Sequence, residues 1–166
     1  QYTYAPACTP LPTMAGATFD GYLRANGRAG VRNEIWLIPT VGCVNEVCSR
    51  LAAEHDGPAK AMGLDGVHAF PHPYGCSQMG EDHAATRQIL ADLARHPNAG
   101  GVLVVGLGCE NNTMEQFQAE LGQWDEASTK FMVCPPEEDE LEPGRRLLAR
   151  LMENAAAAQR QPADRG

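Results

Sequence analysis

Three cysteines of this 166-residue chain stand in one repeated turn motif, Gly-Cys-x-(Asn/Gln), and each could supply a sulfur ligand or a reactive thiol. The cysteines of the three copies, Cys43, Cys76 and Cys109, are 33 residues apart each time. A strand–helix unit that returns to the same edge of a sheet has about this length. Because open α/β folds bind their ligands at that edge, we expect the three thiols to meet there.

Three neighbouring thiolates repel one another unless a cation lies among them, and sulfur ligands favour iron, iron–sulfur clusters, zinc or copper(I). Three cysteine ligands leave one position on the metal open, as a Lewis-acid site requires. A closed structural zinc site would require a fourth ligand, for which His72 and Cys134 are the candidates. The alternatives are a disulfide between two of the three cysteines, and a tight-packing Gly-Cys turn that is repeated by chance.

A histidine and three arginines are further candidates. His72 lies between two prolines in the loop before Cys76, and prolines fix φ, so its imidazole is held in place as a ligand or a general base would be. A structural loop histidine is the alternative. Arg24, Arg28 and Arg32 lie in a glycine-rich segment and could bind carboxylates through paired N–H donors. Three solvated surface charges are the alternative for them.

The hydrophobic pattern predicts four strands that alternate with helices, because short bounded apolar runs are typical of buried parallel strands. This alternation implies an open parallel α/β sheet of about four strands with helices on both faces, Rossmann- or flavodoxin-like. We expect the strand order 2-1-3-4, with the topological switch beside Cys43 and Cys109. The predicted strands are 34–40, 66–70, 101–106 and 130–134, and the predicted helices are 42–55, 81–96, 114–121 and 141–155.

The same pattern divides the chain into three parts. Residues 1–18 are expected to be an extended arm or linker, 19–156 the α/β domain, and 157–166 a tail or a linker to a further C-terminal domain. The residues Asp56-Gly57-Pro58 are expected to break the chain after the first helix.

Composition and charge exclude several classes of protein. The net charge of −8 and the lack of a basic stripe argue against nucleic acid as a partner. The sequence has no apolar run of membrane-spanning length and no signal-peptide pattern. Six cysteines in a chain of this size, three of them in a matched motif, favour a reduced, cytoplasmic setting over a disulfide framework. Because the chain begins at Gln1 and not Met, we expect a piece of something longer.

Four motifs in order resemble the altronate dehydratase / galactarate dehydratase family, over about residues 18–155. The versions at 32–36 and 70–78 are most similar to the altronate dehydratase branch, and a sulfolactate sulfo-lyase also belongs to the family. The four motifs are Gly-Tyr-Leu-Arg with Gly-Arg-Ala-Gly-Val-Arg-Asn (21–33), Pro-Thr-Val-Gly-Cys-Val-Asn (39–45), Phe-Pro-His-Pro-Tyr-Gly-Cys-Ser-Gln (70–78), and His-Pro-Asn with Val-Gly-Leu-Gly-Cys-Glu-Asn (96–98 and 105–111).

The resemblance implies a metal-dependent hydro-lyase that converts an altronate-type hexonate, or a hexarate, to a 2-keto-3-deoxy sugar acid. It implies Fe²⁺, an iron–sulfur cluster or Mn²⁺ as the cofactor. It also implies that this chain is only the middle domain, inactive by itself, with the N- and C-terminal domains of the same enzyme and a small sugar acid as partners. The resemblance is also compatible with a homo-oligomer.

Site residues carry over from the resemblance motif by motif. The implied metal ligands are Cys43, Cys76 and Cys109, and His72 is the best local candidate for the general base, although the base could also lie in the C-terminal domain. Arginines 24, 28 and 32 would contact the substrate carboxylate or another domain. A scaffold or oligomerisation domain, with the cysteines as packing residues, is the alternative of a different class. The remaining implied substrate contacts are Asn45, Gln78, Glu110 and Asn111.

Overall fold

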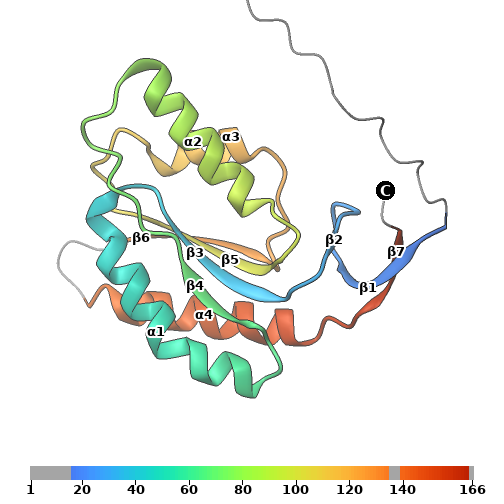
Figure 1. The fold of residues 1–166 in the computed structure, drawn as a ribbon. Coiled ribbons are helices and arrows are strands. Elements are labelled where there is room, and N and C mark those ends of the chain that lie inside the picture. The colour runs from blue at the N-terminus through green and yellow to red at the C-terminus, as the bar shows by residue number, and fades with distance from the viewer. Residues whose placement is uncertain (1–15, 135–138, 165–166) are drawn as a thin grey trace, which may run out of the picture.

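A four-stranded parallel sheet forms the centre of the protein, whose structure, a computed structural model, describes residues 16–134 and 139–164. The strands lie in the order β4-β3-β5-β6 (Figure 1). In chain order this is 2-1-3-4, so the predicted topology is confirmed. The strand bounds are Glu34–Pro39 for β3, Gly66–Ala69 for β4, Ala99–Gly106 for β5 and Thr129–Val133 for β6.

Helices cover both faces of this sheet, as the alternating pattern predicts. Figure 1 shows α1 and α4 on one face, and α2 and α3 on the other. Strand β3 serves both cores because successive side chains point to opposite faces: Ile35 and Leu37 pack with α1 and α4, and Ile38 with α2 and α3. The helix bounds are Asn45–Ala61 for α1, Gly80–Ala94 for α2, Met114–Leu121 for α3 and Leu141–Ala156 for α4.

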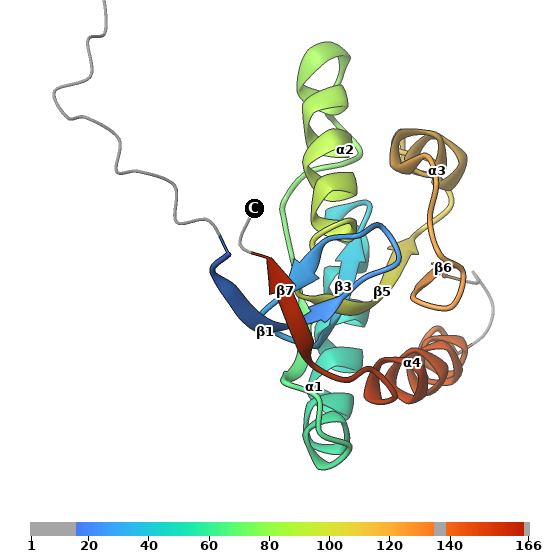
Figure 2. The ribbon, with the colours of Figure 1, turned by 90° about the vertical axis from the view of Figure 1, so that its right-hand side faces the viewer.

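A second, three-stranded sheet is built from the two ends of the described chain. Its order is β2-β1-β7, with β1 at Thr18–Leu23, β2 at Ala29–Gly30 and β7 at Gln161–Asp164. Figure 2 shows β1 and β7 side by side, and their antiparallel pairing runs from Thr18 with Asp164 to Gly21 with Gln161. Residues 161–164, expected to belong to a tail or linker, are therefore a paired strand.

Strand β7 is held in place by contacts of Arg160, the residue before it, and not by a strand pattern in its own sequence. Gln-Pro-Ala-Asp shows no alternation, but Arg160 fastens the segment: its Nη1 donates to the carbonyl of Asp20 and its Nη2 to that of Val31, both at 2.9 Å. The guanidinium also lies over the ring of Tyr22, 4.7 Å from the centroid. Tertiary contacts thus order a segment of low intrinsic strand propensity.

The predicted break at Asp56-Gly57-Pro58 is wrong, because α1 continues to Ala61. Pro58 lies inside the helix near its C-terminal end, so its missing N–H leaves the carbonyl of Glu54 without the usual backbone donor, and the helix continues despite this loss. Asp56 pairs with Lys60 at 2.7 Å and accepts the backbone N–H of Val67, which leads into β4.

Within the described ranges, no helix has the length and apolar character that a membrane span would require.

Candidate metal centre at the carboxyl edge of the sheet

The three motif cysteines follow the carboxyl ends of three neighbouring strands. Cys43 lies in a single 3₁₀ turn, η1 (Gly42–Val44), between β3 and α1; Cys76 lies in the loop between β4 and α2, and Cys109 in the turn after β5. All three are free and exposed. The sulfur atoms of Cys43 and Cys76 are 3.9 Å apart, within reach of a thiol hydrogen bond.

The groups at this edge disfavour ionisation of Cys76. The hydrogen bond with Cys43 raises the pKa of Cys76 most, burial adds to the increase, and the charges of Cys43, Cys109 and Glu110 raise it further. Cys109 is thus close enough for its charge to act on Cys76. A cation among these groups would favour the thiolate forms that the cluster by itself disfavours.

The spacing of the two closest sulfurs fits a shared metal ion. A tetrahedral ion with metal–sulfur bonds of about 2.3 Å holds two thiolates about 3.8 Å apart, and the observed separation is 3.9 Å. In the parts of the chain that the structure describes, no three His, Cys, Asp or Glu side chains form a ready-made ligand set. A complete centre therefore requires a shift of the Cys109 turn or ligands from outside these parts.

The amide side chains of the motif connect the three turns. Asn45 donates its Nδ2 to the carbonyl of His72 at 2.8 Å and accepts the N–H of His72 at 3.3 Å, which ties the start of α1 to the Cys76 loop. Asn111 donates to the carbonyl of Cys76 at 3.3 Å, which ties the Cys109 turn to the same loop. Two amides predicted as substrate contacts thus hold the middle cysteine loop between its neighbours.

Backbone packing brings the first two turns into direct contact. The N–H of Gly42 donates to the carbonyl of Tyr74 at 2.7 Å. Gly75 has φ +136°, and a Cβ built on it would lie 2.9 Å from the Cα of Val41. A Cβ on Gly42 would lie 2.8 Å from the carbonyl oxygen of His72. The glycine before each of these cysteines therefore permits a close approach that a larger residue would prevent.

Both ring nitrogens of His72 bind backbone groups. The N–H of Tyr74 donates to Nδ1 at 3.2 Å, so the ring proton belongs on Nε2, which donates to the carbonyl of Pro39 at 2.8 Å. A general base requires a free ring nitrogen that faces its substrate. In this arrangement His72 holds its loop against the end of β3 instead.

Glu110 is buried inside the Cys109 turn. Its Oε1 accepts hydrogen bonds from the hydroxyl of Thr40 at 2.7 Å and from the N–H of Leu107 at 3.1 Å, and its Oε2 accepts one from the N–H of Gly108 at 2.5 Å. Burial raises the pKa of the Glu110 carboxyl, but these bonds and one from its own N–H outweigh burial, and the pKa lies below the usual value. Glu110 is therefore a charged carboxylate that stabilises the turn.

Two further amide oxygens at this edge are buried and have no hydrogen-bond partner among the described residues: Gln78 Oε1 and Asn112 Oδ1. The Nδ2 of Asn112 donates to the carbonyl of Thr40 at 3.4 Å. Thr40 and Asn112 were not among the sequence-predicted site residues. The available signal was their position, since Thr40 directly precedes one Gly-Cys turn region and Asn112 ends another.

The two remaining described cysteines lie below the surface. Cys48 is 0% exposed and Cys134 is 4% exposed. Burial raises the pKa of Cys48 to about 12, with the charge of Cys134 adding to the increase. Burial also raises the pKa of Cys134 to about 11, helped by Glu140 and Glu110. Both thiols pack in the hydrophobic core, so Cys134 is not an accessible fourth ligand.

The three predicted arginines lie at the opposite, amino edge of the sheet. Arg24 donates to the carbonyl of Pro97 at 2.7 Å and to that of Arg32 at 3.0 Å. Arg28 donates to the carbonyl of Arg95 at 3.4 Å, and Arg32 forms an ion pair with Glu34. The arginines thus fasten the β1–β2 hairpin to the starts of β3 and β5, and the structure does not bring them together with the thiols.

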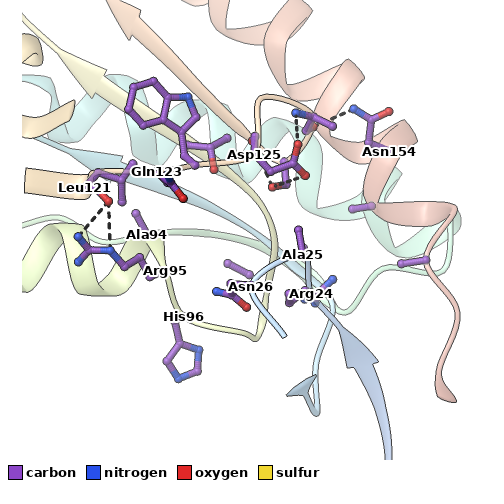
Figure 3. Close-up of a pocket in the computed structure, with 18 of the residues that line it drawn as sticks. Arg24, Ala25, Asn26, Ala94, Arg95, His96, Leu121, Gln123, Asp125 and Asn154 are labelled. Atoms are coloured by element: carbon purple, nitrogen blue, oxygen red, sulfur yellow. Dashed lines mark hydrogen bonds between the residues drawn. The ribbon is translucent and has the colours of Figure 1, made fainter. Parts of the chain in front are cut away.

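A cavity of about 260 Å³ lies at this amino edge, between the β1–β2 turn and the C-terminal ends of α2, α3 and α4. Figure 3 shows Arg95 directed toward the carbonyl of Leu121, to which it donates twice. Asp125 accepts from the N–H of Ala127, whose carbonyl binds Asn154. Several charged and polar groups of the cavity wall are thus already engaged with the protein itself.

Comparison with known proteins decides the family. Residues 21–156 match the family model described as "D-galactarate dehydratase/Altronate hydrolase, second domain". The chain belongs to this family. It is 48% identical over 149 residues to altronate dehydratase of Escherichia coli K12, an alignment that covers 87% of the chain and 30% of the relative.

Two other relatives extend the comparison. Altronate dehydratase of Bacillus subtilis 168 is 42% identical over 162 residues, 96% of the chain and 33% of the relative. The (2R)-sulfolactate sulfo-lyase subunit beta of Chromohalobacter salexigens is 38% identical over 94 residues, 57% of the chain and 22% of the relative. The chain spans about a third of the length of the altronate dehydratases it matches. The predicted family and the match to its second domain are thus confirmed.

Proposed function

We propose that this chain is the thiolate-bearing domain of a metal-dependent hydro-lyase that dehydrates an altronate-type hexonate to a 2-keto-3-deoxy sugar acid. The observation that carries the proposal is the pair of exposed sulfurs 3.9 Å apart at the carboxyl edge of the sheet. The relatives named altronate dehydratase supply the substrate class. Because the chain covers about a third of those relatives, turnover is proposed for a longer enzyme that contains it.

Cys43 and Cys76 would hold the metal, with Cys109 as the third sulfur. Thiolate donors suit Fe²⁺ or an iron–sulfur cluster, with Mn²⁺ as the alternative. When bound, the metal supplies Lewis acidity that stabilises charge on the substrate carboxylate and assists departure of the β-hydroxyl. A setting that keeps five described cysteines reduced, such as the cytoplasm, is part of the proposal.

The other residues at this edge position the thiols. Asn45 and Asn111 hold the Cys76 loop between its two neighbours, and Glu110 holds the Cys109 turn. The dehydration also requires a base that removes the α-proton of the substrate. Because both ring nitrogens of His72 are bound to backbone groups, we place that base outside the described residues.

A scaffold or oligomerisation role is the second candidate. It is favoured by the lack of a complete ligand set in the ranges that the structure describes. In that case the motif amides would serve only to pack three turns, and the metal would be bound by another part of the enzyme.

Turnover by the full-length enzyme distinguishes these roles. Iron-loaded enzyme is assayed on altronate, galactarate and sulfolactate, as wild type and as the Cys43→Ser, Cys76→Ser and Cys109→Ser variants. The proposal expects altronate to be the best substrate and kcat to fall at least about 100-fold in the Cys43 and Cys76 variants. The control is Ser77→Ala, an exposed neighbour in the same loop. If the serine variants keep wild-type turnover, the metal-binding role is excluded and the scaffold role remains.

A further inference from the structure

The Cys43 and Cys76 sulfurs form the one thiol–thiol hydrogen-bond contact among the described residues. Their two loops touch through the backbone, since the N–H of Gly42 donates to the carbonyl of Tyr74 at 2.7 Å. Both cysteines are exposed, so a small soluble oxidant can reach them. Each follows a glycine that lets the two loops approach closely.

We propose that Cys43 and Cys76 are an oxidation site at which a peroxide produces a reversible disulfide, and that Cys109 stays outside it. A disulfide bond is about 2.05 Å long, so the two sulfurs must approach each other by about 2 Å. Rotation about the Cα–Cβ bonds of two exposed cysteines, with a small loop adjustment, supplies a movement of this size. The bonds from Asn45 to His72 keep the loops adjacent while this happens.

The reaction balances with peroxide as the only oxidant. The thiolate of one cysteine attacks a peroxide oxygen, the O–O bond breaks, and the products are a sulfenic acid and hydroxide, which takes up a proton. The second thiolate then attacks the sulfenic sulfur, the S–S bond forms, and hydroxide leaves to become water. In total, two thiols lose two electrons and two protons to hydrogen peroxide, which becomes two waters.

The other described cysteines are separated from this reaction. Cys48 and Cys134 are buried, so peroxide does not reach them. Cys109 is exposed, but no hydrogen bond links its sulfur to another thiol of the described chain. The selectivity follows from geometry and is independent of the proposed function. Only one consequence depends on that function: the disulfide would remove two of the three proposed metal ligands.

Peptide mapping tests the site directly. The protein is reduced, freed of metal, treated with hydrogen peroxide, blocked with iodoacetamide and cleaved after Lys, Arg and Glu. These cuts separate the cysteines, with Cys43 on residues 35–46, Cys48 on 47–50, Cys76 on 61–81 and Cys109 on 96–110. The expected product is 35–46 joined to 61–81, with two hydrogens fewer than the separate peptides, and dithiothreitol should release it.

Three variants test which cysteines form the link. Cys43→Ser and Cys76→Ser should each lose the joined peptide, and Cys109→Ser should keep it. A major cross-link through Cys109 would overturn the proposal, as would irreversible oxidation of Cys43 and Cys76 with no link between them. Failure of the proposed metal site would leave this outcome unchanged, because the mapping uses metal-free protein.

Discussion

Asn45 and the backbone of His72 hold each other through two hydrogen bonds, 2.8 Å to the carbonyl and 3.3 Å from the N–H. Asn45 follows the first motif cysteine by two positions, and His72 lies on the loop that carries the second. Asn111 makes a similar link from the third motif to the carbonyl of Cys76. Two of the three motif amides thus join their copies of the motif to the Cys76 loop.

Replacement of Asn45 by alanine should loosen the Cys76 loop. Two partly buried hydrogen bonds are lost, so the free energy of unfolding should fall by about 1–2 kcal/mol. Denaturant unfolding measures this loss, and Ser49→Ala, at an exposed position of the same helix, is the control. Equal stability of Asn45→Ala and wild type would show that the amide does not hold the loop.

Stability should depend on pH through Glu110. Because its pKa is lowered in the folded state, the carboxylate stabilises the fold fully above its unfolded pKa of about 4.3. This contribution is lost as the pH falls from there through the lower folded value. Glu110→Gln should cost about 2–3 kcal/mol at pH 7, since charged acceptors of backbone N–H groups are removed.

The cost of Glu110→Gln should therefore shrink in acid. Unfolding curves of wild type and variant between neutral pH and about pH 3 measure this convergence. Glu126→Gln, at an exposed loop position, should follow wild type throughout. A cost that stays constant with pH would mean that the carboxylate charge does not contribute.

His72 should behave as a positioning residue. His72→Gln keeps an amide N–H for the carbonyl of Pro39, whereas His72→Ala keeps neither ring bond, so the alanine variant should lose about 1–2 kcal/mol more stability. In the full-length enzyme the pH profile of kcat should keep its shape in His72→Gln. Loss of one limb of that profile would identify His72 as the general base after all.

Two glycines should respond to alanine to different degrees. At Gly75, φ +136° and the close approach of Val41 leave no room for a Cβ, so Gly75→Ala should destabilise by about 1–3 kcal/mol. At Gly57, inside α1, a Cβ meets nothing within 4 Å beyond its chain neighbours, and the gain in helix propensity opposes the crowding against Pro58, so Gly57→Ala should change stability by less than Gly75→Ala. Thermal unfolding of the two variants measures both effects, and equal shifts would refute this account of the Cys76 loop.

The α/β framework could be predicted because the buried strands carry local signals. Runs such as 101–106 are continuously apolar, and their alternation with helices limits the topology to few choices. The strand β7 and the helical path through Pro58 could not be predicted, because both depend on side-chain contacts from distant or flanking residues. Arg160 orders the first, and Asp56 supports the second.

The site was predictable only in part. Equal spacing places three thiols at one sheet edge, but spacing cannot show that Cys43 and Cys76 come within 3.9 Å. The resemblance implied substrate contacts for Asn45, Glu110 and Asn111. The two asparagines instead bind the Cys76 loop, and Glu110 binds the backbone of its own turn. The chemistry of a polar side chain does not reveal its partner, which the fold alone supplies.

The most direct test of the proposed centre is the iron content of the full-length enzyme purified without oxygen. Wild type is compared with Cys43→Ser and Cys76→Ser, and Ser77→Ala is the control. The account predicts bound iron in wild type and in the control, and a loss of affinity of about tenfold or more in both cysteine variants. Equal iron in all four proteins would contradict the account and would place the metal outside this domain.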